Sequence, residues 1–192
     1  MSNTEKLFHI DVETTGTDAK ENGLVQLAGI IEIDGDIKEK VDLLTCPFPN
    51  DTIEQSALDV IGKTEEEIKS YEDPQPIYRE LISMMDHYVD RYNSSDKFHF
   101  IGYNSRFDES FIREWFRRLN DPYFGSWFYW PAIDASNLAA VELSDVRHTM
   151  PNFKLMTVAK ELGISVDEDK AHDAFFDIVI TRKIYKNLAL VV

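Results

Sequence analysis

The sequence predicts an α/β domain in which a mixed central β-sheet is flanked by α-helices. Strand-like apolar stretches come first in the chain, and later strand-like stretches alternate with segments of helical periodicity. The chain has 192 residues, of which 43% are hydrophobic, and this length and composition suit one domain with a sizeable core. We therefore expect residues 1–192 to form a single domain.

Four strands are expected. Apolar and β-branched residues predict strands over Leu7–Val12, Leu24–Ile33, Ile37–Thr45 and Phe98–Tyr103. The sequence "DGD" at Asp34–Asp36 predicts the turn between the second and third strands. The first three strands would then form a meander connected by hairpins.

Helical signals dominate the rest of the chain. Thr64 and Glu67 have the spacing of a capping box, and Asp73 before Pro74 is typical of an N-cap followed by the first helical position. Further helices are expected over Asp108–Leu119, in a short segment after Ile133, in "KLMTVAKELG" ending at Gly163, and from near His172 to about Leu190.

Composition bounds the function and the setting. The net charge of −15 argues against a general nucleic-acid coat protein, but not against an enzyme that meets nucleic acid at one small cation-bearing site. The start "MSNTEKLFHI" lacks the pattern of a secretory signal, and no apolar run approaches the roughly 20 residues that span a bilayer. Cys46 is the only cysteine, so an internal disulfide is excluded. We expect cytoplasmic residence and no membrane partner.

Two carboxylates end the first strand, in "FHIDVETTGTD". Residues i and i+2 of a strand share a face, so Asp11 and Glu13 would project together while Val12 points into the opposite layer. Like charges this close raise each other's pKa unless a cation lies between them, and carboxylate oxygens suit Mg²⁺ or Mn²⁺. A solvated strand end is the alternative that this pair alone leaves open.

Three more groups fit the same site. Asp108, after the fourth strand, would bring a third carboxylate to the same edge of the sheet, or would only be a charge favoured by a helix N-terminus. His172 and Asp177 are five residues apart, about 140° around a regular helix, so they would converge only if His172 lies at the helix entrance. A surface histidine beside a capping Asp173 is the alternative.

The segments "IDVETTG", "GYNSRFDESF" and "HDAFFD" resemble the three motifs of the DEDDh 3′–5′ exonucleases. The resemblance extends from about Leu7 to about Leu188, and the order of the motifs fits the predicted order of the elements. It implies a ribonuclease H-like fold and a single 3′–5′ exonuclease domain over residues 1–192.

The resemblance also implies a two-metal site that holds Mg²⁺ (or Mn²⁺). Asp11 would bridge the two ions. Glu13 and Asp177 would complete the site of the ion that holds the attacking water, and Asp108 would hold the second ion directly or through water. His172 would be the general base, and nucleoside 5′-monophosphates would leave one at a time from a 3′ end.

The "TTG" turn, Thr14, Thr15 and Gly16, would lie against the terminal nucleotide in such an enzyme. Asn104 would either orient the turn before Asp108 or reach a phosphate. Thr17 stands where some RNA-trimming relatives carry a stacking aromatic residue, and this favours single-stranded DNA or 3′ overhangs as substrate.

Several alternatives remain open. One is an exoribonuclease acting on short or 3′-terminal RNA, and another is a non-catalytic partner subunit that keeps the fold. A metal-dependent phosphatase of another fold is disfavoured, because Asp11 is followed by Val12 and Glu13 rather than by an Asp-x-Asp motif. A homodimer and a polymerase or repair partner are both compatible with the sequence.

Two clusters have an open role. The aromatic segment Tyr123–Trp130 would be a base-stacking platform or a hydrophobic plug or dimer surface, and we favour the plug or surface. Arg113, Arg117 and Arg118 would guide a phosphate backbone or only solvate their helix.

Overall fold

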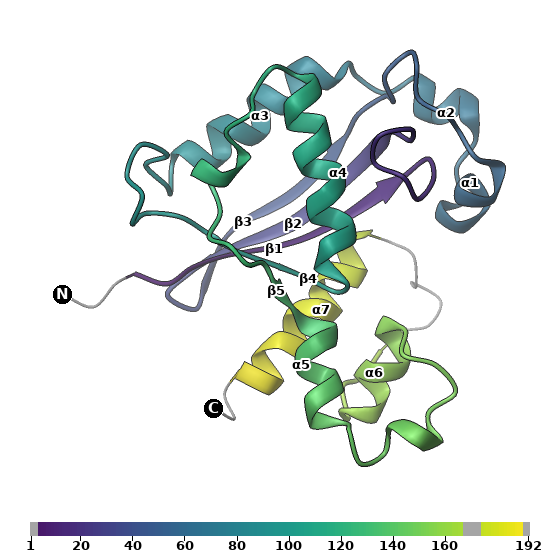
Figure 1. The fold of residues 1–192 in the computed structure, drawn as a ribbon, viewed down its shortest axis with the longest axis vertical. Helices are drawn as coiled ribbons and strands as arrows, with labels where there is room; N and C mark the ends of the chain where they lie inside the picture. Colours follow the sequence, from purple (N-terminus) through teal and green to yellow (C-terminus); the bar gives the residue numbers. More distant parts are fainter. Residues whose placement is uncertain (1–3, 167–173, 190–192) are drawn as a thin grey trace.

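The computed structural model describes residues 4–166 and 174–189. Its centre is a five-stranded sheet in the order β3-β2-β1-β4-β5 (Figure 1). The strands are β1 (Lys6–Thr14), β2 (Leu24–Ile33), β3 (Asp36–Leu44), β4 (His99–Gly102) and β5 (Ile133–Asp134). Strands β1 to β3 are antiparallel neighbours, whereas β4 is parallel to β1 and β5 is parallel to β4, which confirms the predicted mixed sheet.

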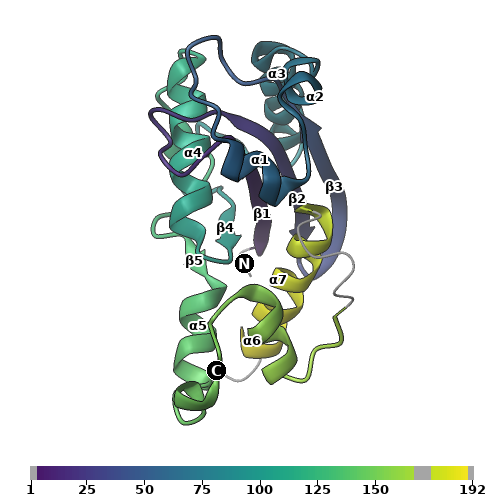
Figure 2. The same cartoon turned by 90° about the vertical axis from the view of Figure 1, so that its right-hand side faces the viewer.

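Helices surround this sheet. They are α1 (Gln55–Ile61), α2 (Glu65–Lys69), α3 (Pro74–Asp86), α4 (Ser105–Arg118), α5 (Ala135–Glu142), α6 (Leu155–Glu161) and α7 (Ala174–Ala189), with short 3-10 turns η1 (Phe124–Ser126) and η2 (Arg147–Thr149). Figure 2 shows α5, α6 and α7 gathered at one end of the molecule, away from α3. No helix in the described ranges is long and apolar enough to cross a membrane.

The apolar interior is divided into two main clusters. The larger one joins β1 and β2 to α3 and α4, through residues that include Phe8, Ile10, Leu81 and Phe116. The second joins α5, α6 and α7, through residues that include Ala139, Val158, Ile180 and Ile184.

Strand β1 separates the two sides by its alternation. Phe8, Ile10 and Val12 are buried in the larger core. His9 points to the opposite side, where its ring centroid lies 5.6 Å from that of Tyr185 in α7. By the same alternation, Asp11 and Glu13 point toward the α7 side, as predicted from the period of two.

Helix caps agree with the sequence in part. The Thr64 side chain accepts a hydrogen bond from the Glu67 amide at 3.1 Å, as the capping box predicts. Asp73 occupies the N-cap of α3 before Pro74, although its side chain makes no capping hydrogen bond. Helix α1 and strand β5 were not predicted, because each is too short to show a periodic pattern.

One helix boundary was wrong. We expected a helix to begin at Asp108, but α4 begins at Ser105. Asn104 precedes it with φ of 62°, a left-handed conformation that asparagine tolerates better than most residues. The sharp turn at Asn104 lets the helix start sooner and puts Asp108 inside its first turn.

Gly29 tests how tightly β1 and β2 pack. A Cβ atom added there would lie 2.5 Å from Phe8 Cε2 and 2.8 Å from the His9 carbonyl oxygen. We expect Gly29→Ala to lower the free energy of unfolding by about 1–3 kcal/mol through overpacking, measured by chemical denaturation. Gly125→Ala is the control, because no heavy atom lies within 4 Å of its added Cβ. Equal stability of the two variants would contradict this packing.

Candidate functional site

Asp11 and Glu13 lie in the part of β1 that extends beyond its pairing with the parallel strand β4. The last paired residues of β1 and β4 are His9 and Ile101, so the end of β1 extends past β4. The register of β1 with β2 shifts between Glu13 and Thr14, directly after the two carboxylates. The two side chains therefore project from the end of β1 that is no longer paired with β4. This end lies at the carboxyl edge of the sheet, where α/β proteins bind ligands.

Asp108 lies close to the last residue of β4, since a Cβ atom added at Gly102 would be 3.2 Å from Asp108 Oδ2. It is 3% exposed and lies in the first turn of α4. Its Oδ1 accepts a hydrogen bond from the Val12 amide at 3.1 Å. This bond ties a carboxylate from a distant segment to the backbone between Asp11 and Glu13.

Asp177 joins the group from the first turn of α7. The pKa of Asp11 is raised well above its ordinary value, first by burial and then by the charges of Asp108, Glu13 and Asp177. Burial also raises the pKa of Asp108, although hydrogen bonds from backbone amides oppose this, and the Glu13 charge raises it further. The four predicted carboxylates are therefore close enough to oppose one another's ionisation.

A hard divalent cation fits this donor set by its chemistry. All four side chains offer carboxylate oxygens, and a cation among them would offset the repulsion that raises the pKa of Asp11. In the described part of the chain no three acidic, histidine or cysteine side chains are already arranged as a metal-binding group.

His172 lies outside the described residues, so its position relative to Asp177 stays a prediction.

The "TTG" turn is held by internal hydrogen bonds. The Thr14 hydroxyl donates to the Gly16 carbonyl at 2.7 Å. Thr15 is fully buried, and its hydroxyl donates to the Thr52 carbonyl at 2.7 Å and accepts from the Gly23 amide at 2.8 Å. These bonds fix the turn beside the carboxylates. Direct contact of Thr14, Thr15 and Gly16 with a nucleotide stays a prediction.

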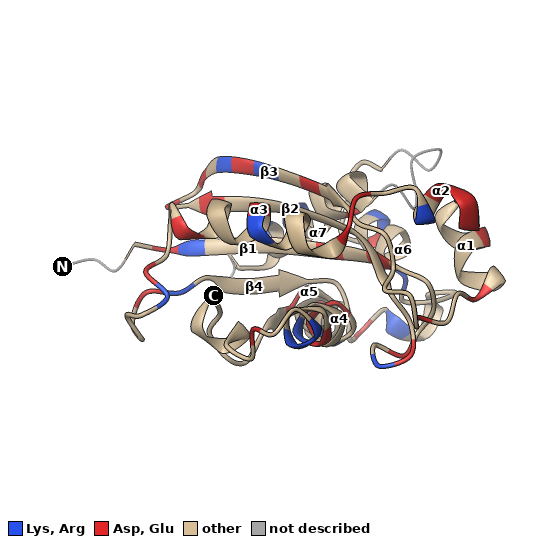
Figure 3. Cartoon of the chain, turned by 90° about the horizontal axis from the view of Figure 1, so that it is seen from above, with Lys and Arg blue, Asp and Glu red and all other residues tan. Residues whose placement is uncertain are grey.

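An open groove of about 850 Å³ lies between the loop after β1 and α4. Asn104 lines it with an exposed side chain, while its amide donates to Asp134 Oδ1 at 3.0 Å. The charged side chains along the groove are four basic and two acidic: Lys20, Arg106, Arg113, Arg117, Asp18 and Glu114. An excess of basic groups here contrasts with the acidic chain as a whole, and Figure 3 shows both signs on α4.

The three arginines singled out from the sequence, Arg113, Arg117 and Arg118, each pair with an acidic side chain. Arg113 pairs with Glu109 at 2.6 Å, and Arg117 pairs with Glu114 at 2.5 Å. Arg118 pairs with Asp51 and lies outside the lining of the groove. Arg113 and Arg117 thus remain near the groove, while Arg118 joins α4 to the loop before α1.

The aromatic segment Tyr123–Trp130 is divided between interior and surface. Phe124, Trp127 and Phe128 are buried in the larger core, which confirms the hydrophobic-plug interpretation for these three. Tyr123 and Trp130 are 63% and 81% exposed. Tyr123 and Trp130 are therefore the side chains of this segment most open to stacking on a base.

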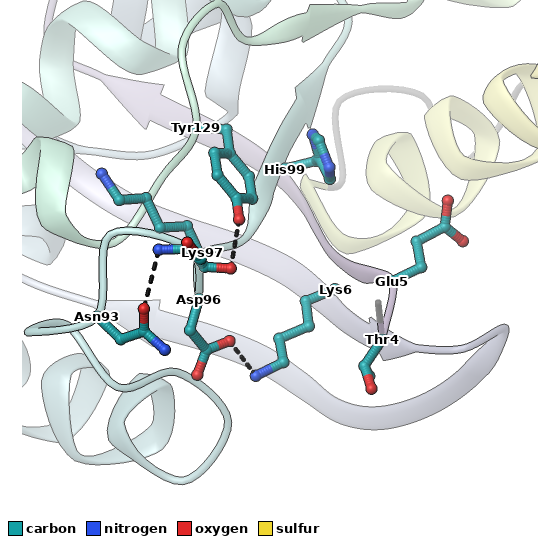
Figure 4. A pocket seen from close by; sticks show the side chains of 9 residues that line it. Thr4, Glu5, Lys6, Asn93, Asp96, Lys97, His99 and Tyr129 are labelled. Atoms are coloured by element: carbon teal, nitrogen blue, oxygen red, sulfur yellow. Dashed lines mark hydrogen bonds and ion pairs between the residues drawn. The ribbon is translucent and has the colours of Figure 1, made fainter. Parts of the chain in front are cut away.

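A second cavity, of about 480 Å³, lies at the opposite end of the parallel strands (Figure 4). Lys6 and His99, the first residues of β1 and β4, line it. Some of its polar groups pair with one another: Lys6 pairs with Asp96, and the Tyr129 hydroxyl donates to the Ser95 carbonyl at 2.6 Å. It contains none of the predicted site residues.

Asp134 was missed by the sequence analysis. It caps α5 by accepting from the Ser136 amide at 2.9 Å, and its charge raises the pKa of Asp108. The available signal was an acidic residue between an apolar stretch and a helix in "IDASNLA". Asp134 thus links the Asn104 turn and α5 to the carboxylate group.

Comparisons with known proteins agree with the arrangement. The family model RNase_T, described as "Exonuclease", matches residues 8–185. The zinc-bound complex of E. coli exonuclease I with single-stranded DNA has a TM-score of 0.77 at 21% identity, over 97% of this chain and 40% of that chain. The same enzyme with a dT13 oligonucleotide has a TM-score of 0.73 at 20% identity, over 97% of this chain and 42% of that chain.

A curated relative has a larger architecture. A PolC-type DNA polymerase III of Oceanobacillus iheyensis is 23% identical over 171 residues, which is 89% of this chain and 10% of the relative. The chain thus spans about a tenth of that relative and about two fifths of exonuclease I. The structural likeness confirms the predicted ribonuclease H-like fold.

The repulsion around Asp11 predicts a stability change. The folded-state pKa of Asp11 is raised, so the unfolded chain loses this proton at lower pH, and the group costs stability as pH rises above about 4. We expect Asp11→Asn to raise the melting temperature of the metal-free protein at pH 8, by about 2–4 °C for each ~1 kcal/mol of relief.

Differential scanning calorimetry at pH 4 and pH 8, in the presence of EDTA, checks this. The stabilisation should be larger at pH 8. Asp42→Asn on the exposed face of β3 is the control, and a variant of Asp11 that melts lower than wild type at pH 8 would show that the carboxylate is not under repulsion.

Proposed function

The chain belongs to the RNase_T exonuclease family and is a 3′–5′ exonuclease domain of the hydrolase class, and on this premise we propose its substrate and mechanism. The substrate is single-stranded DNA or a 3′ overhang. Phosphodiester bonds are hydrolysed from the 3′ end, and nucleoside 5′-monophosphates are released.

One observation carries this proposal: β1, α4 and α7 bring three other carboxylates, Glu13, Asp108 and Asp177, within electrostatic reach of Asp11. Carboxylates gathered in this way destabilise the fold when they are ionised, and a non-catalytic scaffold would gain nothing from such a cluster. The rival reading as a non-catalytic partner subunit is therefore disfavoured.

Members of this family use divalent metals. Asp11, Glu13, Asp108 and Asp177 would hold two Mg²⁺ (or Mn²⁺) ions, with Asp11 shared between them. When bound, the cations supply the positive charge that makes water nucleophilic near neutral pH and offsets charge on the departing 3′-oxygen.

The protein's own groups prepare this site. The Val12 amide orients Asp108 through a hydrogen bond at 3.1 Å, and burial keeps competing water away from that carboxylate. Glu13 follows two residues after Asp11 on the same face of β1. His172, by family resemblance, accepts the proton of the attacking water as general base.

The groove beside α4 supports a single strand as substrate. Its four basic side chains suit the backbone phosphates of a strand that enters next to Asn104. Two structural neighbours are complexes of E. coli exonuclease I with single-stranded DNA or a dT13 oligonucleotide. They favour DNA over the alternative of short or 3′-terminal RNA. The PolC-type relative favours a polymerase or repair partner over a homodimer.

A degradation assay tests the proposal. Single-stranded DNA, duplex DNA, RNA and a dinucleotide, each labelled at the 5′ end, are incubated with Mg²⁺, Mn²⁺ or EDTA. We expect a ladder that shortens from the 3′ end of single-stranded DNA, with no cleavage in EDTA.

Asp11→Asn should lower kcat by at least about 10³-fold while the protein stays folded, since the shared metal ligand is lost. His172→Ala should lower kcat by about 10²-fold or more, as expected for loss of a general base. Full activity of Asp11→Asn would rule out the metal site. Faster degradation of RNA than of DNA would support the exoribonuclease alternative.

A further inference from the structure

A buried ionic cluster lies outside the carboxylate site, at the junction of the sheet and α7. Glu32 of β2 is 0% exposed. Its Oε2 accepts a hydrogen bond from Arg182 Nε at 2.6 Å, and its Oε1 pairs with Lys186 Nζ. His9 Nε2 lies 3.8 Å from Oε2. Both cations belong to α7, so one buried carboxylate holds two positions of that helix.

The charge of Glu32 persists at neutral pH. Burial raises the pKa of Glu32, but contacts with His9, Lys186 and Arg182 outweigh this and lower it to about 2. A buried carboxylate is costly unless it is paired, and removing one partner of a buried pair leaves an uncompensated charge. Glu32, Arg182 and Lys186 therefore stay paired as long as α7 is docked on the sheet.

The ionic cluster and the carboxylate site share α7, and their strands, β2 and β1, are hydrogen-bonded neighbours. Glu32 of β2 is paired with Leu7 of β1, and Leu7 precedes Asp11 by four residues. Four strand residues span about 13 Å. From Asp177 to Lys186 is nine helical residues, which also span about 13.5 Å. Helix α7 runs opposite to β1, and the two lengths are nearly equal. A contact between Lys186 and Glu32 at one end therefore places Asp177 beside Asp11 at the other.

Packing holds α7 on two sides, toward α5 and α6 and toward the sheet. Its buried side chains Ile180, Ile184 and Leu188 pack with α5 and α6. Among the described residues, this second core contains no side chain from any strand of the sheet. Helix α7 also packs against β1 and β2, where Tyr185 lies against His9. The Glu32 cluster adds ionic contacts to β2 at two defined positions of the helix, Arg182 and Lys186.

We propose that Glu32 is a positioning residue for the exonuclease reaction: with Arg182 and Lys186, it fixes the axial register of α7 on the sheet and so holds Asp177 beside Asp11. This inference rests on the proposed function. Cation ligands must keep their separation to bind tightly, and Asp177 belongs to a different element from Asp11 and Glu13. A loosened α7 would therefore weaken the cation site without altering any of its ligands.

The test compares Glu32→Gln, which removes the charge and keeps the shape, with Glu67→Gln as control. Glu67 on α2 also accepts from two donors, Lys63 Nζ at 2.7 Å and the Tyr71 hydroxyl at 2.9 Å, and lies outside the site. The readouts are the Kd for Mn²⁺ from electron paramagnetic resonance of the free ion, kcat and KM on a single-stranded oligonucleotide, and the melting temperature.

We expect Glu32→Gln to raise the Kd for Mn²⁺ by about tenfold, as for other groups that orient metal ligands. The kcat should fall at Mn²⁺ concentrations that saturate the wild type, with KM within about twofold. Lys186→Met should have a similar effect, and Lys186→Arg should restore Mn²⁺ binding. A lower melting temperature with an unchanged Kd for Mn²⁺ would mean that Glu32 is only structural, and would overturn the inference.

If Glu32→Gln fails to fold, the same measurements on Arg182→Gln and Lys186→Met test the inference. Both of these side chains are partly exposed, so their replacement is less disruptive to folding. A wild-type protein that binds Mn²⁺ but cleaves no nucleic acid would contradict the proposed function, while the comparison of Kd values would still test the role of Glu32. Wild-type activity with unchanged Kd values in all variants would overturn this inference alone.

Discussion

Repulsion among carboxylates is the constraint on which the rest of this structure depends. Asp11 is half-buried at the end of β1 with three other acidic side chains in reach, and every one of them opposes its ionisation. An arrangement of this kind is stable only when the surrounding fold holds its members firmly or when cations lie among them. The sheet, α4 and α7 supply the first condition, and the oxygen-only donor set fits the second.

Helices α4 and α7 each hold one of these carboxylates, and they do so in the same way. Asp108 and Asp177 both lie in the first turn of their helices, where the helix dipole favours a negative charge. Asp108 is further fixed by the Val12 amide, and α7 is fixed by the Glu32 cluster. The site thus lies between the two apolar cores, and its geometry depends on polar contacts that join them.

Much of this could be predicted from the sequence, because the signals are local. The alternation in β1 places Asp11 and Glu13 on one face, and "IDVETTG" and "GYNSRFDESF" carry family motifs that fix the order of the elements. The cap at Thr64 follows from a three-residue spacing. The extent of the single domain, homodimerisation and cytoplasmic residence remain predictions.

The features that were missed depend on distant contacts. The early start of α4 follows from the left-handed conformation of Asn104, which is supported by the hydrogen bond that its backbone N–H donates to Asp134 Oδ1. Glu32 appears in the sequence as a single acid in an apolar strand, and its partners come 150 residues later. No local pattern connects such residues, because they meet only when α7 packs on the sheet.

Crystals grown with Mn²⁺ offer the most direct measurement of the central claim. An anomalous difference map should show a peak within coordination distance, about 2.0–2.3 Å, of oxygens from Asp11 and at least two of Glu13, Asp108 and Asp177. A map with no peak among these side chains at saturating Mn²⁺, or with the ion bound only elsewhere, would contradict the claim that cations make this gathering of carboxylates tolerable.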